Sequence, residues 1–231
     1  MLLKNRPFNR EEPERSATKI YIFCEGKDRE FKYFQYFEGI DSRLNLIVHE
    51  LASSDDNSPK GLLLLAQNSL IKSEKNLEPK YDYREDDKVW IVLDTDKDIT
   101  NSRKPQLIDL RAYCDNRINW NVAQSNPCFE VWLYYHQEKN KPDFKGIDVC
   151  NEWKPFVGNT IKGGFNPRKH PILIQNAITN SEPHFQVNDN GFPVVATTEV
   201  FKLAKDILSI GKISDKIYHE LSENHDDNLK P

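Results

Sequence analysis

Carboxylate side chains follow two predicted buried strands, at the point where each strand ends. The segment VWIVLDTDKDIT (residues 89–100) carries Asp94, Asp96 and Asp98 at alternate positions after an apolar run, and Glu25 ends the apolar run IYIFCE. Ligands of open parallel sheets bind outside the carboxyl ends of the strands. Carboxylates placed together there repel one another unless a cation neutralises them. Because hard divalent ions prefer such oxygen ligands, we expect a Mg²⁺ or Mn²⁺ site at Glu25, Asp94 and Asp96.

Two other interpretations of residues 94–100 compete with a metal site. The spacing resembles the start of an EF-hand loop, but Ile99 and Pro105 stand where that loop needs Gly and Glu. A strand also precedes the segment, where an EF-hand has a helix. Aspartates after strands commonly cap turns for structural reasons alone. The second carboxylate at a strand end, Glu25, favours the metal site.

Neither a P-loop nor a zinc site is indicated. The segment GNTIKGGF (residues 158–165) has two glycines at P-loop spacing, but Gly164 and Phe165 replace the Lys and the Ser or Thr that bind phosphate and Mg²⁺. The six histidines form no HxxxH pair, and His136 lies six residues from Glu130, off its helical face. The sequence therefore gives no support to ATPase or zinc chemistry.

Strand-like and helix-like segments alternate along the first part of the chain. Ser58 and Pro59 are a typical N-cap and first residue of a helix. The alternation predicts an α/β fold with a mostly parallel sheet flanked by helices on both faces. The predicted strands cover residues 19–26, 43–51, 88–93 and 118–125, and the predicted helices cover residues 29–37, 58–76, 106–116 and 127–137, the last opened by Asn126 and Pro127.

Beyond about residue 139 the strand pattern fades. The segment TTEVFKLAKDILSI (residues 197–210) predicts a helix capped by Thr197 or Thr198. The final residues are polar and are expected to fray. The predicted organisation is an N-terminal extension (1–17), an α/β domain (18–138), an α-helical C-terminal appendage (139–215) and a polar tail (216–231).

Composition excludes several classes of protein. The 231 residues are 38% hydrophobic, enough for a real core, and the net charge of -4 means that any nucleic-acid contact must come from a local basic patch. The four cysteines form no CxxC pair and are expected to be core thiols in a reducing compartment. The N-terminal residues lack the apolar run of a signal peptide, and no membrane-spanning run occurs, so we expect a cytoplasmic protein with no membrane contact.

Three segments carry a family resemblance. IYIFCEGKDREFKYF, VWIVLDTDKD and SNPCFEVWLYYH occur in this order and, together with the flanking residues, span Thr18 to His136. They resemble the RloB-like family, whose members have a Toprim-type domain and are linked to restriction and abortive-infection loci. The segments NAITNS and FPVVATTEVFKLAKDIL resemble the weaker C-terminal pattern of that family. The resemblance implies a Toprim-like sheet in residues 18–138.

The resemblance also implies roles for acidic residues. Glu25 would be the Toprim glutamate, a general acid or base in relatives that cut or rejoin nucleic acid. Asp94 and Asp96 would be the paired metal ligands, and Glu130 matches the acid after NPCF.

Other positions near the first segment can be compared with the family. Glu30 and Tyr33 match the acid and the aromatic residue that follow the first segment in RloB-like chains. Arg29 stands where the family commonly has Thr. That departure leaves the metal site unchanged and affects how the loop after the first strand meets substrate.

The residues and the resemblance both indicate phosphodiester chemistry. Metal ions held by carboxylates polarise a phosphate and orient an attacking water, so we expect a metal-dependent nuclease active in anti-phage defence. Lys162, Arg168 and Lys169 are candidates for gripping phosphates, although each is as readily a solvated surface charge. The resemblance suggests an AAA- or ABC-type ATPase partner encoded in the same locus. A non-catalytic module that binds nucleic acid or nucleotide, and a nucleotidyl transferase, would use the same fold.

Overall fold

The computed structural model describes residues 5–74, 76–95, 103–142, 150–161 and 164–226. Five strands form one sheet in the order β2-β1-β3-β4-β5. The first four strands in the sequence run parallel, and the last pairs antiparallel with β4. The strands are β1 (Thr18–Cys24), β2 (Leu44–His49), β3 (Lys88–Asp94), β4 (Trp120–Asn126) and β5 (Thr197–Thr198).

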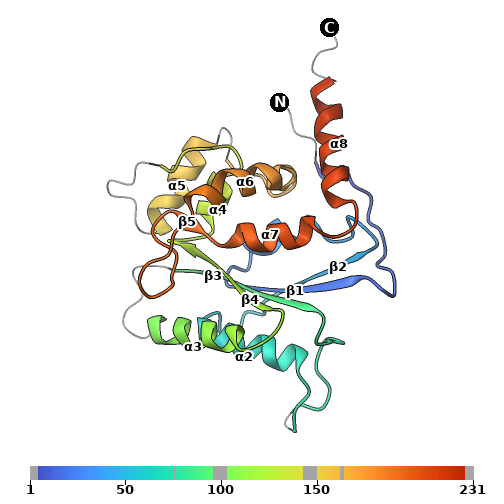
Figure 1. Cartoon of the computed structure of the whole chain (residues 1–231), viewed down its shortest axis with the longest axis vertical. Helices are drawn as coiled ribbons and strands as arrows, with labels where there is room; N and C mark the ends of the chain where they lie inside the picture. The colour runs from blue at the N-terminus through green and yellow to red at the C-terminus, as the bar shows by residue number, and fades with distance from the viewer. Residues whose placement is uncertain (1–4, 75, 96–102, 143–149, 162–163, 227–231) are drawn as a thin grey trace.

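Helices cover both faces of this sheet, which confirms the predicted α/β class (Figure 1). One face carries α2 (Pro59–Leu70) and α3 (Arg103–Asp115). Two 3-10 turns, η1 (His170–Leu173) and η2 (Glu182–His184), flank the helix α6 (Ile174–Ser181). The other face carries α1 (Arg29–Gln35), α4 (Glu130–Tyr134), α5 (Cys150–Thr160), α6 (Ile174–Ser181), α7 (Val200–Leu208) and α8 (Ile213–Asp226).

Alternate residues of each central strand enter different cores. In β1, Ile20 and Ile22 pack with the α1 and α4–α8 layer, whereas Tyr21 and Phe23 pack with the α2 and α3 layer. Side chains of a strand point alternately to opposite faces, so a strand covered on both faces is apolar throughout. This double burial explains the continuous apolar runs in the sequence.

The C-terminal helices share the core of the sheet. Ile174, Leu203 and Ile217 belong to the same buried cluster as Ile20 on β1. The predicted polar tail differs at its start, because residues 216–226 continue α8. Ile213 and Ile217 recur at helical spacing and are buried, which holds the first turns of α8 against the core.

The ends of the helices and strands test three predictions about single residues. Ser58 caps α2 as predicted: its side chain accepts a hydrogen bond from the Gly61 N–H, and Pro59 is the first helical residue. Pro127 does not open a helix, because Asn126 is still part of β4 and α4 begins only at Glu130. The residue before a proline is held extended, which suits the strand end.

The prediction that Thr197 or Thr198 would be the N-cap of a helix was wrong. Both residues form β5, and Glu199 is the N-cap of α7. Thr198 still contributes to the helix start, since its hydroxyl accepts a hydrogen bond from the Val200 N–H at 3.1 Å.

The four cysteines are free and buried, as expected of core thiols. Among the described residues, no helix is both long and apolar enough to cross a membrane.

Candidate active site

Glu25 and Asp94 meet at the carboxyl edge of the sheet, where the strand order reverses. β1 lies between β2 and β3, so the chain leaves β1 toward one side for β2 and returns to the other side for β3. Such switch points form the binding crevice of open α/β sheets. The Glu25 N–H donates to the Val92 carbonyl at 2.9 Å, and the Asp94 N–H donates to Glu25 Oε2 at 3.0 Å.

Glu30, in the first turn of α1, brings a third carboxylate to this edge. A side chain at Gly26 would collide with the Glu30 carboxylate, so that carboxylate lies directly against the backbone after Glu25. Only 7% of Glu30 is exposed. Burial raises the pKa of Glu30 to about 7, and the charges of Glu130 and Glu25 add to the rise.

Asp94 is held in place by the start of α4. Its Oδ1 accepts a hydrogen bond from the Phe129 N–H at 2.9 Å. Burial raises the pKa of the Asp94 carboxyl well above its usual range, and Glu30, Glu25 and Glu130 raise it further. A bound cation would offset this repulsion and favour the ionised form of Asp94.

Glu130 is the first residue of α4 and is 2% exposed. The structure brings its carboxylate near enough to raise the pKa of both Glu30 and Asp94. Its Oε1 pairs with Arg29, the first residue of α1. The sequence pattern after β4 therefore supplies a fourth carboxylate to the same edge.

Two arginines neutralise part of this carboxylate cluster, which we define as Glu25, Glu30, Asp94 and Glu130. Arg103, at the start of α3 and 5% exposed, pairs with Glu25 Oε2 at 2.5 Å and donates to the Asp94 carbonyl at 2.8 Å. Sequence reasoning missed Arg103, because its segment NSRKPQ has the composition of a solvated loop.

The carboxylate cluster suits a hard divalent cation by its donor atoms. Neither Glu30 nor Asp94 forms an ion pair with a described residue, so two of the four acids lack a cationic partner within the described part of the chain. No three acidic, histidine or cysteine side chains among the described residues are already arranged to hold a metal. Glu25 and Glu130 each face an arginine, and the predicted ligand Asp96 lies outside the described residues.

A family model described as RloB-like protein matches residues 20–207, which is most of the chain. The chain belongs to the RloB-like family. Comparisons with curated proteins and with solved structures gave no significant match. In this RloB-like chain the matched region contains all four members of the carboxylate cluster, the whole sheet beyond its first residues, α1 to α6, and all of α7 except Leu208.

Tyr33, the aromatic residue singled out after the first segment, is a core residue in this RloB-like protein. Tyr33 is fully buried, and its hydroxyl lies 3.1 Å from Nε2 of His136. The Nδ1 of His136 lies 3.0 Å from the Trp132 carbonyl, which can only accept, so Nε2 accepts from Tyr33. Burial lowers the pKa of His136 to about 3, so the ring is neutral.

We expect Tyr33→Phe to lower the free energy of unfolding by about 1–3 kcal/mol, because it leaves the buried Nε2 of His136 without a donor. Urea denaturation measures this change. Tyr218→Phe is the matched control, since Tyr218 is 70% exposed. Unchanged stability combined with lost activity would instead show that Tyr33 takes part in the reaction.

Buried thiols near the carboxylate cluster are not suited to act as nucleophiles. Burial raises the pKa of Cys24 well above its usual range, with Glu30 adding to the rise. The hydrogen bond with Cys150 is the main cause that raises the pKa of Cys128, and burial raises it further. Both thiols are therefore protonated at neutral pH in the metal-free protein, and a protonated thiol is a poor nucleophile.

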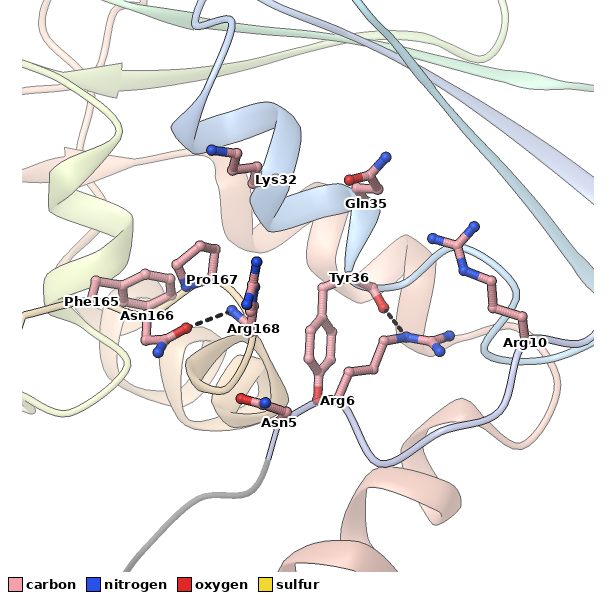
Figure 2. Close-up of a pocket in the computed structure, with 10 residues that line it drawn as sticks. All are labelled: Asn5, Arg6, Arg10, Lys32, Gln35, Tyr36, Phe165, Asn166, Pro167 and Arg168. Carbon is pink, nitrogen blue, oxygen red and sulfur yellow. Dashed lines mark hydrogen bonds between the residues drawn. The ribbon is translucent and has the colours of Figure 1, made fainter.

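The three predicted phosphate-binding cations are distant in sequence from the carboxylate cluster. The structure places only two of them. Arg168 lines a hollow between the N-terminal segment and α1 (Figure 2). Lys169 is half-buried and is the N-cap residue of η1. Lys162 lies outside the described residues.

Proposed function

We propose that this RloB-like protein is a divalent-metal-dependent nuclease that hydrolyses phosphodiester bonds of nucleic acid. The observation that supports it is the carboxylate cluster: four largely buried acids, from the ends of β1 and β3 and the starts of α1 and α4, gathered at the switch point of the sheet. Such a concentration of acids costs stability in an isolated fold and is typical of functional sites.

The residues of the cluster have separable roles in this proposal. Glu25, Asp94 and Asp96 would hold Mg²⁺ or Mn²⁺, which supplies polarisation of the phosphate and activation of water when bound. The Phe129 N–H orients Asp94, and the Asp94 N–H orients Glu25. We assign proton transfer to Glu25.

Glu30 is the competing proton carrier. Its pKa of about 7 lets it exchange a proton near neutral pH, where general acid–base catalysis is most efficient. Arg103 and Arg29 hold positive charge beside Glu25 and Glu130, where charge develops on a phosphate during cleavage.

Incubation of the purified protein with labelled single-stranded and double-stranded DNA and RNA tests the proposal directly. We expect products with Mg²⁺ or Mn²⁺ and none with chelator. Retention of any of these substrates without products under all metal conditions contradicts the nuclease assignment.

Glu130→Gln tests whether α4 contributes to the site. We expect lost cleavage and a weakened stabilisation by metal, because Glu130 lies close enough to raise the pKa of Asp94. A purely structural glutamate in a first helical turn would instead contribute about 0.3–1 kcal/mol through the helix dipole and leave the metal response intact. Thermal unfolding with and without Mn²⁺ measures the difference. Glu152→Gln is the control, since Glu152 is exposed in the first turn of α5.

A second function has one observation in its favour. Because Glu25 and Glu130 already pair with arginines, the site is also compatible with a non-catalytic module that binds nucleic acid or nucleotide and acts with an ATPase. Binding without turnover in the experiment above is its expected result. For either function we propose action in the cytoplasm during anti-phage defence, with an ATPase partner.

A further inference from the structure

A hollow of about 710 Å³ lies between the N-terminal segment, α1 and the loop before η1 (Figure 2). Four cations line it: Arg6 and Arg10 from the N-terminal segment, Lys32 from α1, and Arg168 from the loop. None of its lining residues is acidic. Arg10 and Lys32 also pair with Glu38 and Asp28 beside the hollow. In a chain with a net charge of -4, four cations around one hollow still favour an anionic ligand.

The N-terminal segment is fastened across the molecule to form this hollow. The Arg6 guanidinium donates to the carbonyls of Tyr36, Phe8 and Glu38 at 2.7, 2.5 and 2.8 Å, and the Arg6 N–H donates to the Arg168 carbonyl at 2.8 Å. These partners are all neutral carbonyls. The charge of Arg6 is thus fixed in place without a carboxylate ion pair among the described residues, and an anion in the hollow would add to the counter-charge of the nearby Glu38.

Figure 2 shows Tyr36 between Arg168 and Arg6. The Tyr36 hydroxyl is buried and has no hydrogen-bond partner among the described residues. An unpartnered buried donor costs about 1–3 kcal/mol, so an acceptor from outside the described residues, such as a ligand oxygen, would stabilise this wall of the hollow.

A second hollow, of about 420 Å³, continues from the first toward the carboxylate cluster. The two hollows share Lys32, Phe165 and Pro167 among their lining residues, so they adjoin. The second adds Lys154 and Arg29, and Arg29 pairs with Glu130 of the carboxylate cluster. Cationic side chains therefore mark a path from Arg6 and Arg168 to the acids; Asp28 is the one acid that lines it.

We propose that the two hollows form a track for single-stranded nucleic acid, which leads one strand to the carboxylate cluster. That the strand is led to a cleavage site rests on the proposed function, whereas its binding in the two hollows does not. Both hollows are of the size that encloses small ligands, so a flexible strand can enter where a rigid duplex contacts only the rim. Phe165, half-buried between the hollows, offers a ring on which a base can stack.

Fluorescence anisotropy with a labelled oligonucleotide of about 12 nucleotides, in EDTA so that no cleavage occurs, tests the track. The informative variant is Lys32→Gln/Arg168→Gln. It removes two charges from side chains that carry no part of the Arg6 anchoring network. Because each phosphate contact contributes about 0.7 to the salt slope of a single strand, we expect the slope of log K against log salt to become shallower by about 1.4. The Kd at about 0.1 M salt should rise roughly tenfold to thirtyfold.

Lys60→Gln/Lys72→Gln is the matched control. Both lysines are exposed, at the start of α2 and just after its end, on the opposite face of the sheet. The control should keep the wild-type salt slope. An equal loss of affinity in the two double variants would refute the track, because it would show a general effect of net charge.

Three other outcomes overturn the inference: no oligonucleotide binding by the wild type, equal or tighter binding of a duplex of the same length, and displacement of the oligonucleotide by ATP at equal phosphate concentration. The nuclease proposal fails separately. Single-strand binding that depends on Lys32 and Arg168, without metal-dependent cleavage, refutes the nuclease and supports the track. Cleavage with unchanged binding by Lys32→Gln/Arg168→Gln refutes the track alone.

Discussion

Glu25→Gln is expected to lower the rate of phosphodiester cleavage by about 10²–10⁴-fold, the usual contribution of a general acid or base. Glutamine keeps a side-chain oxygen that can accept from the Asp94 N–H and from Arg103, so the local structure persists. Substrate affinity, measured without metal, should stay within a few fold, because proton transfer contributes mainly in the transition state. Single-turnover cleavage at saturating substrate measures the effect.

Two variants make this result specific. Glu50→Gln is the control, since Glu50 follows β2 as Glu25 follows β1, but is exposed. Glu30→Gln tests the competing proton carrier. Full cleavage by Glu25→Gln together with a large loss in Glu30→Gln would move the proton-transfer role to Glu30, whose pKa is about 7.

Mg²⁺ or Mn²⁺ at about a hundred times its Kd is expected to stabilise the wild type by about 2.7 kcal/mol and Asp94→Asn very little. For a chain of this size, the gain corresponds to a rise in Tm of about 5–11 °C. The asparagine oxygen can still accept the hydrogen bond from the Phe129 N–H. The variant therefore loses the negative charge but keeps the contact with the start of α4. Thermal unfolding with and without metal measures the response.

The same variant has a second signature in the absence of metal. Glu30, Glu25 and Glu130 all raise the pKa of Asp94, so removing its charge relieves repulsion within the carboxylate cluster. Metal-free Asp94→Asn should therefore be at least as stable as the wild type. Asp109→Asn, on the exposed side of α3, is the control. An equal metal response in wild type and Asp94→Asn would place the metal site elsewhere.

The two arginines of the site connect these predictions with the proposed track. Arg29 pairs with Glu130 and also lines the second hollow, so it lies at the meeting point of the cationic path and the carboxylate cluster. A strand following the track would meet Arg29 before it meets the acids.

The sequence by itself determined the α/β class and two of the strand ends that build the site. Apolar runs such as KVWIVL predict a strand because both faces of β3 are buried. The end of the strand is also predicted, because polar residues begin there. The start of α2 at Ser58 and Pro59 could also be predicted from the sequence, because an N-cap and the first helical residue are neighbours in the chain.

Only the tertiary structure decided which charges meet. Arg103 and Glu25 are 78 positions apart, and Arg29 and Glu130 are 101 positions apart. No local pattern encodes such pairs, because they depend on the order of strands in the sheet. The same reason explains why β5 was missed: two threonines gain strand geometry only by pairing with β4. The basic hollow likewise exists only because Arg6 bonds across the fold to the loop that carries Arg168.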